Sequence, residues 1–552
     1  MTIFPLRQGA RALALAALLG ASLGLGLTGC SSVPARPAGW SAPQPLVQPS
    51  PFAGVHGLAI DAQGRLLAGS VVGNTMWEVD RRTGQARVFI DAPEGQADDI
   101  AVGPRGELAW TNYLMGILRY REREGMPLQV LAKDLPGLNS LDFDRRNGKL
   151  YASQVFLGDA LWEIDRSGQT PPRLIRKDLG GFNGFEVGPD GMLYGPLWFK
   201  GQVVKIDPQS GALTVIADGF QIPAAANLDG KGNLWVVDTR TGELVKVALD
   251  SGKKTVVAQL EPSLDNLAIA PDGTIYVSNM ANNAVDAVDP INGARRRLTG
   301  SPVAVPAGLR IDGRTLWVAD VFGFREVDTV TGKVSDVFRM QREPELEYPF
   351  AVGVSPSRFA LASWFTGTVQ IVDRASRRTV HTIHGLKAPY DALPMNDGSV
   401  VYTELGTGSV VHAAGNDFAQ RGLLASGLQG PLQLALDAAG RFYVSEAGGR
   451  VLRLVPGGEP VTVATGLAMP EGLAFTPWGS LVVAETAARR LTEIDPSTGS
   501  RRTVAENLPI GMAGGPGMPP PYVPTGVAVG EDGSIYYSAD RNNGIYRIRP
   551  AR

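Results

Sequence analysis

The feature that most constrains this 552-residue chain is a short unit that returns about twelve times along it. In one copy, Leu267 to Asp289, a short apolar strand is followed by a Pro-Asp-Gly turn, an alternating strand, a polar turn and a third strand. Proline and glycine set the turn dihedrals, and alternation with a period of two is typical of half-buried strands. Helical periodicity is missing after the N-terminal segment, so the sequence predicts an all-β fold.

The spacing of the units predicts their architecture. A glycine such as Gly232 or Gly273 marks the first turn of nearly every copy, at steps of about 40 to 45 residues, which is the length of one four-stranded propeller blade. A fourth strand follows the third, for example Thr255 to Leu260. A single ring of about twelve four-stranded blades would leave an empty bore. We therefore predict two tandem six-bladed β-propellers, in residues 43–292 and 293–552.

Closure of the two rings calls for strands from elsewhere in the chain. The last unit has no fourth strand after Gly544 to Ile548, and propellers do not leave a sheet edge open at the ring junction. Gln44 to Gln48 belongs to no unit of its own. We expect it to complete the blade of Leu267 to Asp289, and we expect Ala294 to Thr299 to complete the last blade.

The N-terminus predicts a lipid anchor. Arg7 and Arg11 precede an apolar run, Ala12 to Leu27, that is too short and glycine-rich for a membrane span, and Leu27-Thr28-Gly29-Cys30 resembles a bacterial lipobox. The resemblance implies a signal peptide, 1–29, cleaved before an acylated Cys30, with 30–42 as a Ser- and Pro-rich tether. Serines at 31 and 32 favour the outer membrane, facing the periplasm. The alternative is an ordinary secretory signal with an incidental cysteine.

Net charge excludes one class of partner. Lys and Arg number 52 against 54 Asp and Glu, and the arginines are interleaved with acids. A basic stripe is therefore missing from the sequence, and we expect no nucleic-acid partner.

The repeats resemble a known superfamily. Copies such as Phe185 to Tyr194 and Pro470 to Phe475 are similar to NHL repeats and to the six-bladed SMP-30/gluconolactonase-like and strictosidine-synthase-like propellers. The similarity covers almost everything after residue 43. Members of that superfamily include metal-dependent lactonases and esterases, a Pictet-Spengler synthase and scaffolds without catalysis. The resemblance therefore implies the blade architecture and leaves the reaction open.

Polar residues are aligned at the predicted channel mouth of the first ring. In a propeller, the residue just before each inner strand points into this mouth. Oxygen-bearing side chains around a mouth suit a hard cation such as Ca²⁺, and the alternative is a water-filled channel capped by hydrogen-bonded polar groups. The aligned positions are His56, Asp98, Asn139, Asn183, Ala224 and Asp265.

The resemblance assigns expected roles to some of these positions. Asn183 matches the asparagine that holds the divalent ion in the lactonases, and Asn139 matches one near the substrate. His56 and Ala224 stand where the family has a glutamate and an aspartate. Asp98 and Asp265 supply carboxylates from other blades, so we expect a divalent cation among Asp98, Asn183 and Asp265, with His56 as a base within reach.

The turns between the second and third strands form an apolar crescent around this mouth. We expect Phe156 and Trp198 to contact an amphiphilic substrate there, or else lipid or a partner protein. Inter-blade packing of the turns is the structural alternative. The crescent comprises Val71, Val72, Tyr113, Leu114, Met115, Val155, Phe156, Leu157, Leu197, Trp198 and Phe199.

The second ring has a different mouth. Its aligned residues are largely apolar, so we expect a plugged channel: Ala307, Phe350, Tyr390, Leu432, Glu471 and Thr525. Carboxylates at the ends of its second strands, such as Asp320 and Glu485, are interpreted as acceptors for turn amides. The loop from Pro509 to Pro524 lies on the mouth face, where a long loop is typical of a lid or binding element.

Two functions follow from these observations. One is an envelope lipoprotein that binds, and as an enzyme would hydrolyse, a small lactone- or ester-type molecule at the first mouth with a divalent metal. The other is a non-enzymatic binding or scaffold lipoprotein that uses the apolar crescent for an envelope protein or lipid. The sequence contains neither a nucleophile elbow nor a phosphate-binding loop. It therefore supplies no catalytic motif that would decide between the two functions.

Overall fold

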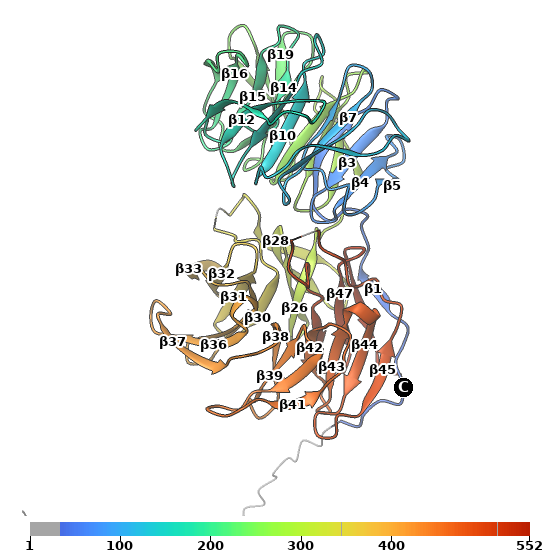
Figure 1. Cartoon of the computed structure of the whole chain (residues 1–552). Coiled ribbons are helices and arrows are strands. Elements are labelled where there is room, and N and C mark those ends of the chain that lie inside the picture. Colours follow the sequence, from blue (N-terminus) through green and yellow to red (C-terminus); the bar gives the residue numbers. More distant parts are fainter. Residues whose placement is uncertain (1–33, 344, 516, 552) are drawn as a thin grey trace, which may run out of the picture. The chain divides into compact units, whose positions relative to one another are not determined.

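Almost every regular element of the chain is a β-strand. A computed structural model describes residues 34–343, 345–515 and 517–551. Within these ranges the strands form twelve four-stranded antiparallel sheets, interrupted only by the short 3₁₀ turns η1 (Leu405–Thr407) and η2 (Thr486–Ala488). The predicted all-β fold of two tandem six-bladed propellers is confirmed (Figure 1).

Each blade of the first ring consists of four strands that are consecutive in the chain. The blades are β2 (Val55–Ile60), β3 (Leu66–Ser70), β4 (Thr75–Val79), β5 (Ala86–Ile90); β6 (Ile100–Val102), β7 (Leu108–Asn112), β8 (Ile117–Arg121), β9 (Gln129–Ala132); β10 (Leu138–Phe143), β11 (Leu150–Gln154), β12 (Ala160–Ile164), β13 (Arg173–Lys177); β14 (Glu186–Val187), β15 (Leu193–Leu197), β16 (Gln202–Ile206), β17 (Leu213–Ala217); β18 (Pro223–Leu228), β19 (Asn233–Asp238), β20 (Glu243–Ala248), β21 (Lys254–Gln259); and β22 (Leu264–Ile269), β23 (Ile275–Asn279), β24 (Ala284–Val288), β25 (Arg295–Thr299).

The second ring repeats this pattern except in its last blade. Its blades are β26 (Pro306–Asp312), β27 (Thr315–Asp320), β28 (Gly323–Asp328), β29 (Val334–Arg339); β30 (Ala351–Val354), β31 (Arg358–Ser363), β32 (Thr368–Asp373), β33 (Arg378–Ile383); β34 (Pro389–Pro394), β35 (Val400–Glu404), β36 (Ser409–Ala414), β37 (Gln420–Ala425); β38 (Pro431–Leu436), β39 (Phe442–Glu446), β40 (Arg450–Arg453), β41 (Val461–Ala464); β42 (Pro470–Phe475), β43 (Leu481–Glu485), β44 (Arg490–Ile494), β45 (Arg501–Ala505); and β46 (Val527–Val529), β47 (Ile535–Ala539), β48 (Gly544–Ile548) with β1 (Gln44–Val47).

The second ring is closed by the N-terminal strand. β1 pairs antiparallel with β48, with Val47 opposite Ile545, and Val47 is buried in an apolar cluster of this ring. In Figure 1 the blue strand β1 lies among the red strands of the last blade. The prediction that Gln44 to Gln48 completes the blade of Leu267 to Asp289 is therefore wrong.

The expected role of Ala294 to Thr299 is wrong as well. β25 pairs with β24 of its own blade, with Val285 opposite Thr299. The hairpin is local: the Asp289 carboxylate accepts a hydrogen bond from the Ile291 amide at 2.7 Å, and Gly293 supplies a positive φ of 72°. A short hairpin costs far less loop entropy than pairing with a distant blade. The expected division into 43–292 and 293–552 thus placed both strands in the wrong ring.

The first ring closes without a shared sheet. Its first inner strand, β2, packs beside its last, β22. The Gly54 amide donates to Asn283 Oδ1 at 2.9 Å, and the Arg81 guanidinium pairs with Asp272 at 2.7 Å. Packing and side-chain hydrogen bonds across the junction take the place of a closing strand.

The predicted tether runs against the second ring in the part that the structure describes. Arg36 Nε lies 2.9 Å from Glu493, and Trp40 packs on Trp478 with ring centroids 5.8 Å apart. From Arg36 onward the chain is one compact unit. The signal peptide 1–29 and Cys30 lie outside the described residues. Among those described, none belongs to a helix of the length and hydrophobicity that crossing a membrane requires.

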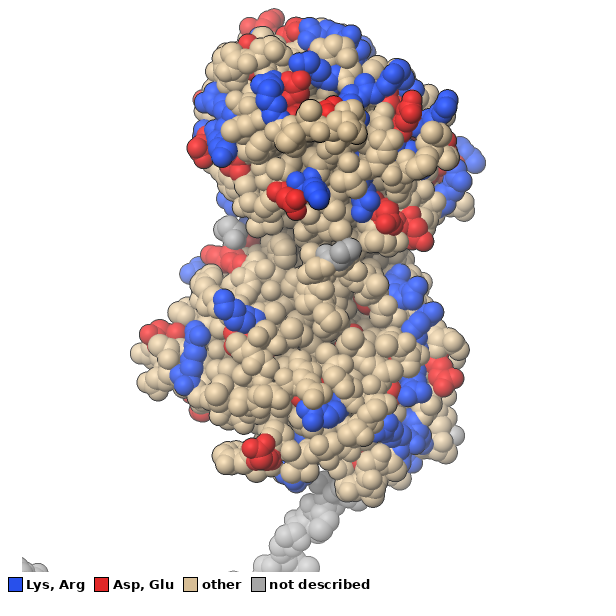
Figure 2. Space-filling view, in the orientation of Figure 1, with Lys and Arg blue, Asp and Glu red and all other residues tan. Residues whose placement is uncertain are grey.

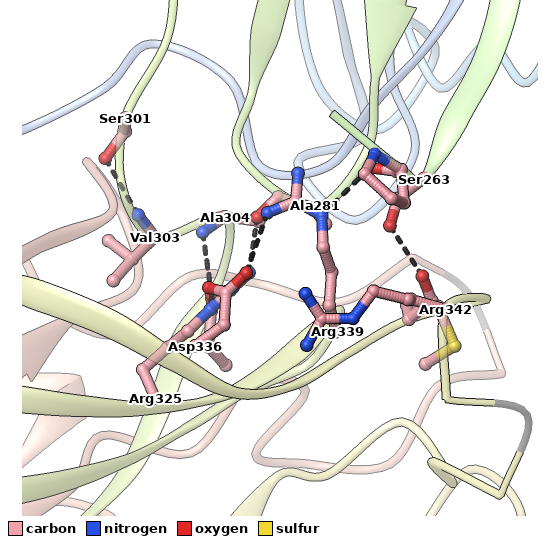
Figure 3. A network of polar contacts seen from close by, with 12 residues as sticks. Ser263, Ala281, Ser301, Val303, Ala304, Arg325, Asp336, Arg339 and Arg342 are labelled. Carbon is pink, nitrogen blue, oxygen red and sulfur yellow. Dashed lines mark hydrogen bonds and ion pairs between the residues drawn. The ribbon is translucent and has the colours of Figure 1, made fainter. Parts of the chain in front are cut away.

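A buried group of arginines joins the two rings (Figure 3). Arg325 is fully buried, pairs with Asp320 and Asp336, and donates to the carbonyl of Ala281 in the first ring at 2.5 Å. Arg339 Nε donates to the Pro262 carbonyl at 2.9 Å. Since these guanidiniums lie in the second ring and their carbonyl acceptors in the first, the network binds one ring to the other.

The surface carries charges of both signs. In the face shown in Figure 2, Lys and Arg lie interspersed with Asp and Glu and do not gather into one stripe.

Candidate functional site

The polar residues at the starts of the inner strands of the first ring meet at one cavity. Asp98 and Asn183 lie just before β6 and β14. The second residues of β2, β10 and β22 are His56, Asn139 and Asp265. Phe156 and Trp198 reach the same cavity from the turns after β11 and β15. The structure therefore brings together every residue predicted for catalysis, substrate or metal: His56, Asp98, Asn139, Phe156, Asn183, Trp198 and Asp265.

The second ring forms the opposite wall of this cavity, which the sequence reasoning missed. A signal was present, because Phe322 and Trp364–Phe365 occupy the same type of turn, after the second strand of a blade, as Trp198 in the first ring. Continuing the scan of these turns into the second ring would have found them. The second ring contributes Val321, Phe322, Gln341, Tyr348, Phe350, Trp364, Phe365 and Tyr522.

His56 is held in one tautomer. Its ring is 8% exposed, and Nδ1 lies 3.0 Å from the carbonyl oxygen of Gly54. A carbonyl oxygen only accepts, so Nδ1 carries a proton, and the neutral form of the ring has its lone pair on Nε2. The ring packs against Phe322, with centroids 5.4 Å apart. His56 thus has the oriented imidazole that a general base requires.

Asp98 and Asp265 bring negative charge into the cavity. Neither carboxylate accepts a hydrogen bond from the residues that the structure describes, and Asp98 is 8% exposed. Burial, followed by repulsion from Asp265 and Asp99, raises the pKa of Asp98 well above its usual value. Burial also raises the pKa of Asp265, against the opposing charge of His56. The two carboxylates therefore lack a partner of opposite charge other than His56.

Asn183 is held by hydrogen bonds at the cavity wall. Its Oδ1 accepts from the Gly184 amide at 3.0 Å, and the single hydroxyl proton of Ser140 can go either to this atom at 2.9 Å or to Asn139 Oδ1 at 2.8 Å. Calcium takes six to eight oxygen ligands, and the described residues contain no group of three or more His, Cys, Asp or Glu side chains arranged for a metal. The cation expected among Asp98, Asn183 and Asp265 stays a prediction, and we derive no step through a metal.

A second layer of acids lies deeper in the first channel and serves the ring itself. Asp142 accepts from the Val187 amide at 2.7 Å, and Glu186 accepts from the Leu228 amide at 2.7 Å, each across to the next blade. Asp99 accepts from Asn266 Nδ2 at 2.9 Å. Burial raises the pKa of Asp142 to about 6 and that of Asp99 and Glu186 to about 7. Inter-blade hydrogen bonding accounts for these carboxylates.

The apolar crescent divides into a buried and an exposed part. Val71, Val155 and Leu197 are buried, as the packing alternative predicts. Phe156 and Phe199 are 44% and 59% exposed, and their rings are 5.7 Å apart. Phe156 also lines the cavity, as does the 37% exposed Phe365 of the second ring. These two phenylalanines mark the place where the cavity meets solvent.

Three lining residues have a left-handed backbone. Phe156, Gln341 and Tyr348 have φ values of 68°, 63° and 47°. This conformation costs a side-chain-bearing residue about 1 to 3 kcal/mol and is concentrated at ligand sites. The strain is a second, independent feature of this cavity.

The second mouth is filled, as expected from its apolar residues. Ala307 and Leu432 are buried, and Tyr390 donates to the Pro521 carbonyl in the long loop. The buried Phe350 borders the inter-ring cavity. The same loop presents Tyr522 to the cavity, and its Tyr522 carbonyl accepts from Trp364 Nε1 at 3.1 Å. The loop therefore covers the second bore.

Carboxylates at the strand ends of the second ring accept hydrogen bonds from turn amides, as interpreted. Asp320 accepts from the Ala304 amide at 2.9 Å, Glu446 from the Gln429 amide at 2.7 Å, and Glu485 from the Ala468 amide at 2.9 Å. Their role is to hold the turns that precede the inner strands.

Comparison with known proteins adds little on function. No family model and no curated protein matches the chain. Among solved structures, one chain of a crystal structure of a nidogen/laminin complex is 16% identical, over 41% of this chain and 91% of that one, with a TM-score of 0.25. A match of this kind carries no functional argument.

Proposed function

We propose that this protein is an envelope lipoprotein that binds a small lactone- or ester-type molecule in the inter-ring cavity, with His56 as the general base of its hydrolysis. One observation carries the proposal: every residue predicted for the site lines the same cavity. Apolar walls with a few convergent polar groups are typical of sites for small organic molecules.

The reaction needs only groups that line the cavity. Nε2 of His56 removes a proton from water, and the resulting hydroxide attacks the acyl carbon. The Nδ2 groups of Asn139 and Asn183 can donate to the oxyanion, because both side chains line the cavity and Asn183 Oδ1 is turned to the Gly184 amide. The acyl C–O bond then breaks, and the proton returns from Nε2 to the leaving alkoxide.

A panel of lactones and aryl esters tests this proposal. Replacement His56→Ala should lower kcat/KM by about 10² to 10⁴-fold, because the general base is lost. His412→Ala, at a half-buried histidine in β36, is the matched control and should leave the rate unchanged. Equal activity in the two variants, or hydrolysis of no ester above the rate in buffer, would remove the enzymatic proposal.

The lipid anchor forms a separate part of the proposal. Its support is the lipobox-like stretch that ends at Cys30. Radiolabelled palmitate should be incorporated by the native chain and not by Cys30→Ser, which should leave the outer-membrane fraction. A Cys30→Ser chain that stays with the membrane would contradict the anchor.

A second candidate function is that of a scaffold or binding protein. The observation in its favour is that Phe156, Leu157 and Phe199 lie exposed on adjacent turns. Cross-linking in the envelope should then lose its partner protein in Phe199→Ser, while Ile291→Ser, at an exposed turn on another part of the ring, should not. Identical cross-linking in both variants would exclude this surface.

A further inference from the structure

The inter-ring cavity contains two acidic side chains and little to compensate their charge. Asp98 and Asp265 line it, and neither lysine nor arginine occurs among its lining residues. An ionised carboxylate in such a site is costly unless a positive charge or hydrogen bonds compensate it, and among the lining residues only His56 can become positive. The pKa of each acid is accordingly raised, which favours the neutral form. A ligand that carries a positive charge would pair with the ionised form of these acids.

The rest of the lining is aromatic. Nine aromatic side chains from both rings face the cavity: Tyr113, Phe156, Trp198, Phe322, Tyr348, Phe350, Trp364, Phe365 and Tyr522. In the second ring they form a continuous series, with centroid separations of 6.1 Å for Phe322 and Tyr348, 5.5 Å for Tyr348 and Phe365, and 6.0 Å for Phe365 and Trp364. Aromatic faces attract cations through the ring quadrupole, and several such faces form the cages that bind quaternary ammonium groups.

The carboxylates and the aromatic wall lie close together. Phe322 packs on His56, whose charge is felt by Asp265. Burial, with the charges of Asp265 and Asp98, raises the pKa of Tyr348 to about 12. Tyr348 of the second ring is therefore a near neighbour of both carboxylates, so one ligand group can meet the charge and the aromatic faces together.

We propose that the cavity selects an organic cation, a quaternary or alkyl-substituted ammonium group, between the carboxylates of Asp98 and Asp265 and the aromatic wall of Phe322, Tyr348 and Trp364. A hydrated divalent ion gains nothing from aromatic faces, and the described residues contain no group of three or more His, Cys, Asp or Glu side chains arranged to hold one. A neutral lactone or ester has no charge with which to pair either acid. This inference names the charged part of the ligand and so rests on binding in the proposed cavity.

Calorimetry on the full chain in detergent tests the inference with three probes. Choline supplies a quaternary ammonium, 3,3-dimethylbutan-1-ol has its shape without the charge, and CaCl₂ supplies a metal alone. Choline should bind saturably, at least about tenfold tighter than the neutral alcohol, because the charge contributes about 1.4 kcal/mol or more. Calcium should not compete with it.

Variants separate a built site from nonspecific attraction. Asp98→Asn and Trp364→Leu should each weaken choline binding at least about tenfold. Asp250→Asn removes the same charge from an exposed turn and should change nothing. Equal affinity for choline and the neutral alcohol, no binding of choline, competition by calcium, or unaltered binding in Asp98→Asn would each overturn the inference.

These experiments distinguish failure of the cation inference from failure of the proposed function. If neutral esters are bound or hydrolysed with His56-dependence while choline gives no advantage, the proposed function stands and the cation inference falls. If choline binds as expected and no ester is hydrolysed, the cavity is a cation-binding site and the hydrolase proposal falls.

Discussion

The two rings share one architecture and use the same positions in opposite ways. At the starts of the inner strands of the first ring stand His56, Asp98 and Asn183, and these line a cavity. The matching positions of the second ring include Tyr390 and Leu432, which are fully buried. The comparison teaches that the residue at the start of each inner strand decides whether a propeller mouth is open or packed. Four changes break or sharpen this contrast.

The largest effect is expected at the arginine that joins the rings. Arg325→Met removes the buried partner of Asp320 and should lower the free energy of unfolding by about 3 to 5 kcal/mol, since an uncompensated charge stays buried. Urea titration followed by tryptophan fluorescence measures it. Arg314→Met, at the exposed pair with Asp328, is the control and should cost less than about 1 kcal/mol. Equal costs would show that burial of the pair does not matter.

The next effect separates the two modes of ring closure. Val47→Asp places a carboxylate in an apolar cluster of the second ring and should cost about 3 kcal/mol. Hydrogen exchange should accelerate in β48 and stay slow in β24. Val256→Asp, on the exposed face of the outer strand β21, should leave exchange unchanged in both. Faster exchange in β24 would contradict the pairing of β1 with β48.

Filling of the second mouth gives a third measurable difference. Leu432→Ala opens a void in a packed channel and should destabilise the protein by about 2 to 4 kcal/mol. Thermal unfolding checks this value. Asn183→Ala at the open mouth of the first ring should cost less, because its side chain faces a cavity and not a packed core. A larger loss for Asn183→Ala would reverse the contrast between the mouths.

The smallest effect is a pH dependence at Asp98. Its pKa is raised in the folded chain, so between pH 4 and that pKa the folded state holds the proton more tightly than the unfolded state. Stability therefore falls as the pH rises through this window. Asp98→Asn should therefore stabilise the protein at pH 8 and have its smallest effect at pH 4.

Thermal midpoints across pH check this prediction. The thermal midpoint of the variant should still fall somewhat as the pH rises, because burial also raises the pKa of Asp99 and of Glu186 to about 7. Asp142 and Arg145 line the same channel as these two acids. Equal stabilisation by Asp98→Asn at pH 4 and at pH 8 would mean that the asparagine improves packing and that loss of the Asp98 charge is not the cause.

Much of the fold was predictable because each blade is a local pattern. Turn glycines mark nearly every unit, and alternating strands recur at about forty residues, so the number of blades follows from short-range chemistry. Closure was not predictable, since Gln44 to Val47 pairs with a strand that lies almost the whole chain away. Nothing in four residues of sequence states which edge they join.

The candidate site was likewise predictable in one part and not in the other. Its first-ring half followed from alignment of the residues before the inner strands, with Asp98 and Asp265 among them. The second-ring wall depends on how two rings dock, through hydrogen bonds such as that from Ser263 Oγ to the Met340 carbonyl. Such contacts are set by tertiary geometry, which no repeat pattern encodes. Tyr348 was therefore missed, whereas Trp364 lies in a turn that the repeat pattern does mark.

The pairing of β1 with β48 also sets an order of assembly. All strands of the first ring are contiguous, so this ring can be completed while later parts of the chain are still being made. The second ring takes one of its strands from residue 44 onward, before the first propeller in the chain. It cannot close until the whole first propeller and then residue 548 have been synthesised. Until then β1 is a free edge, and a chaperone that shields it would govern the yield of folded protein.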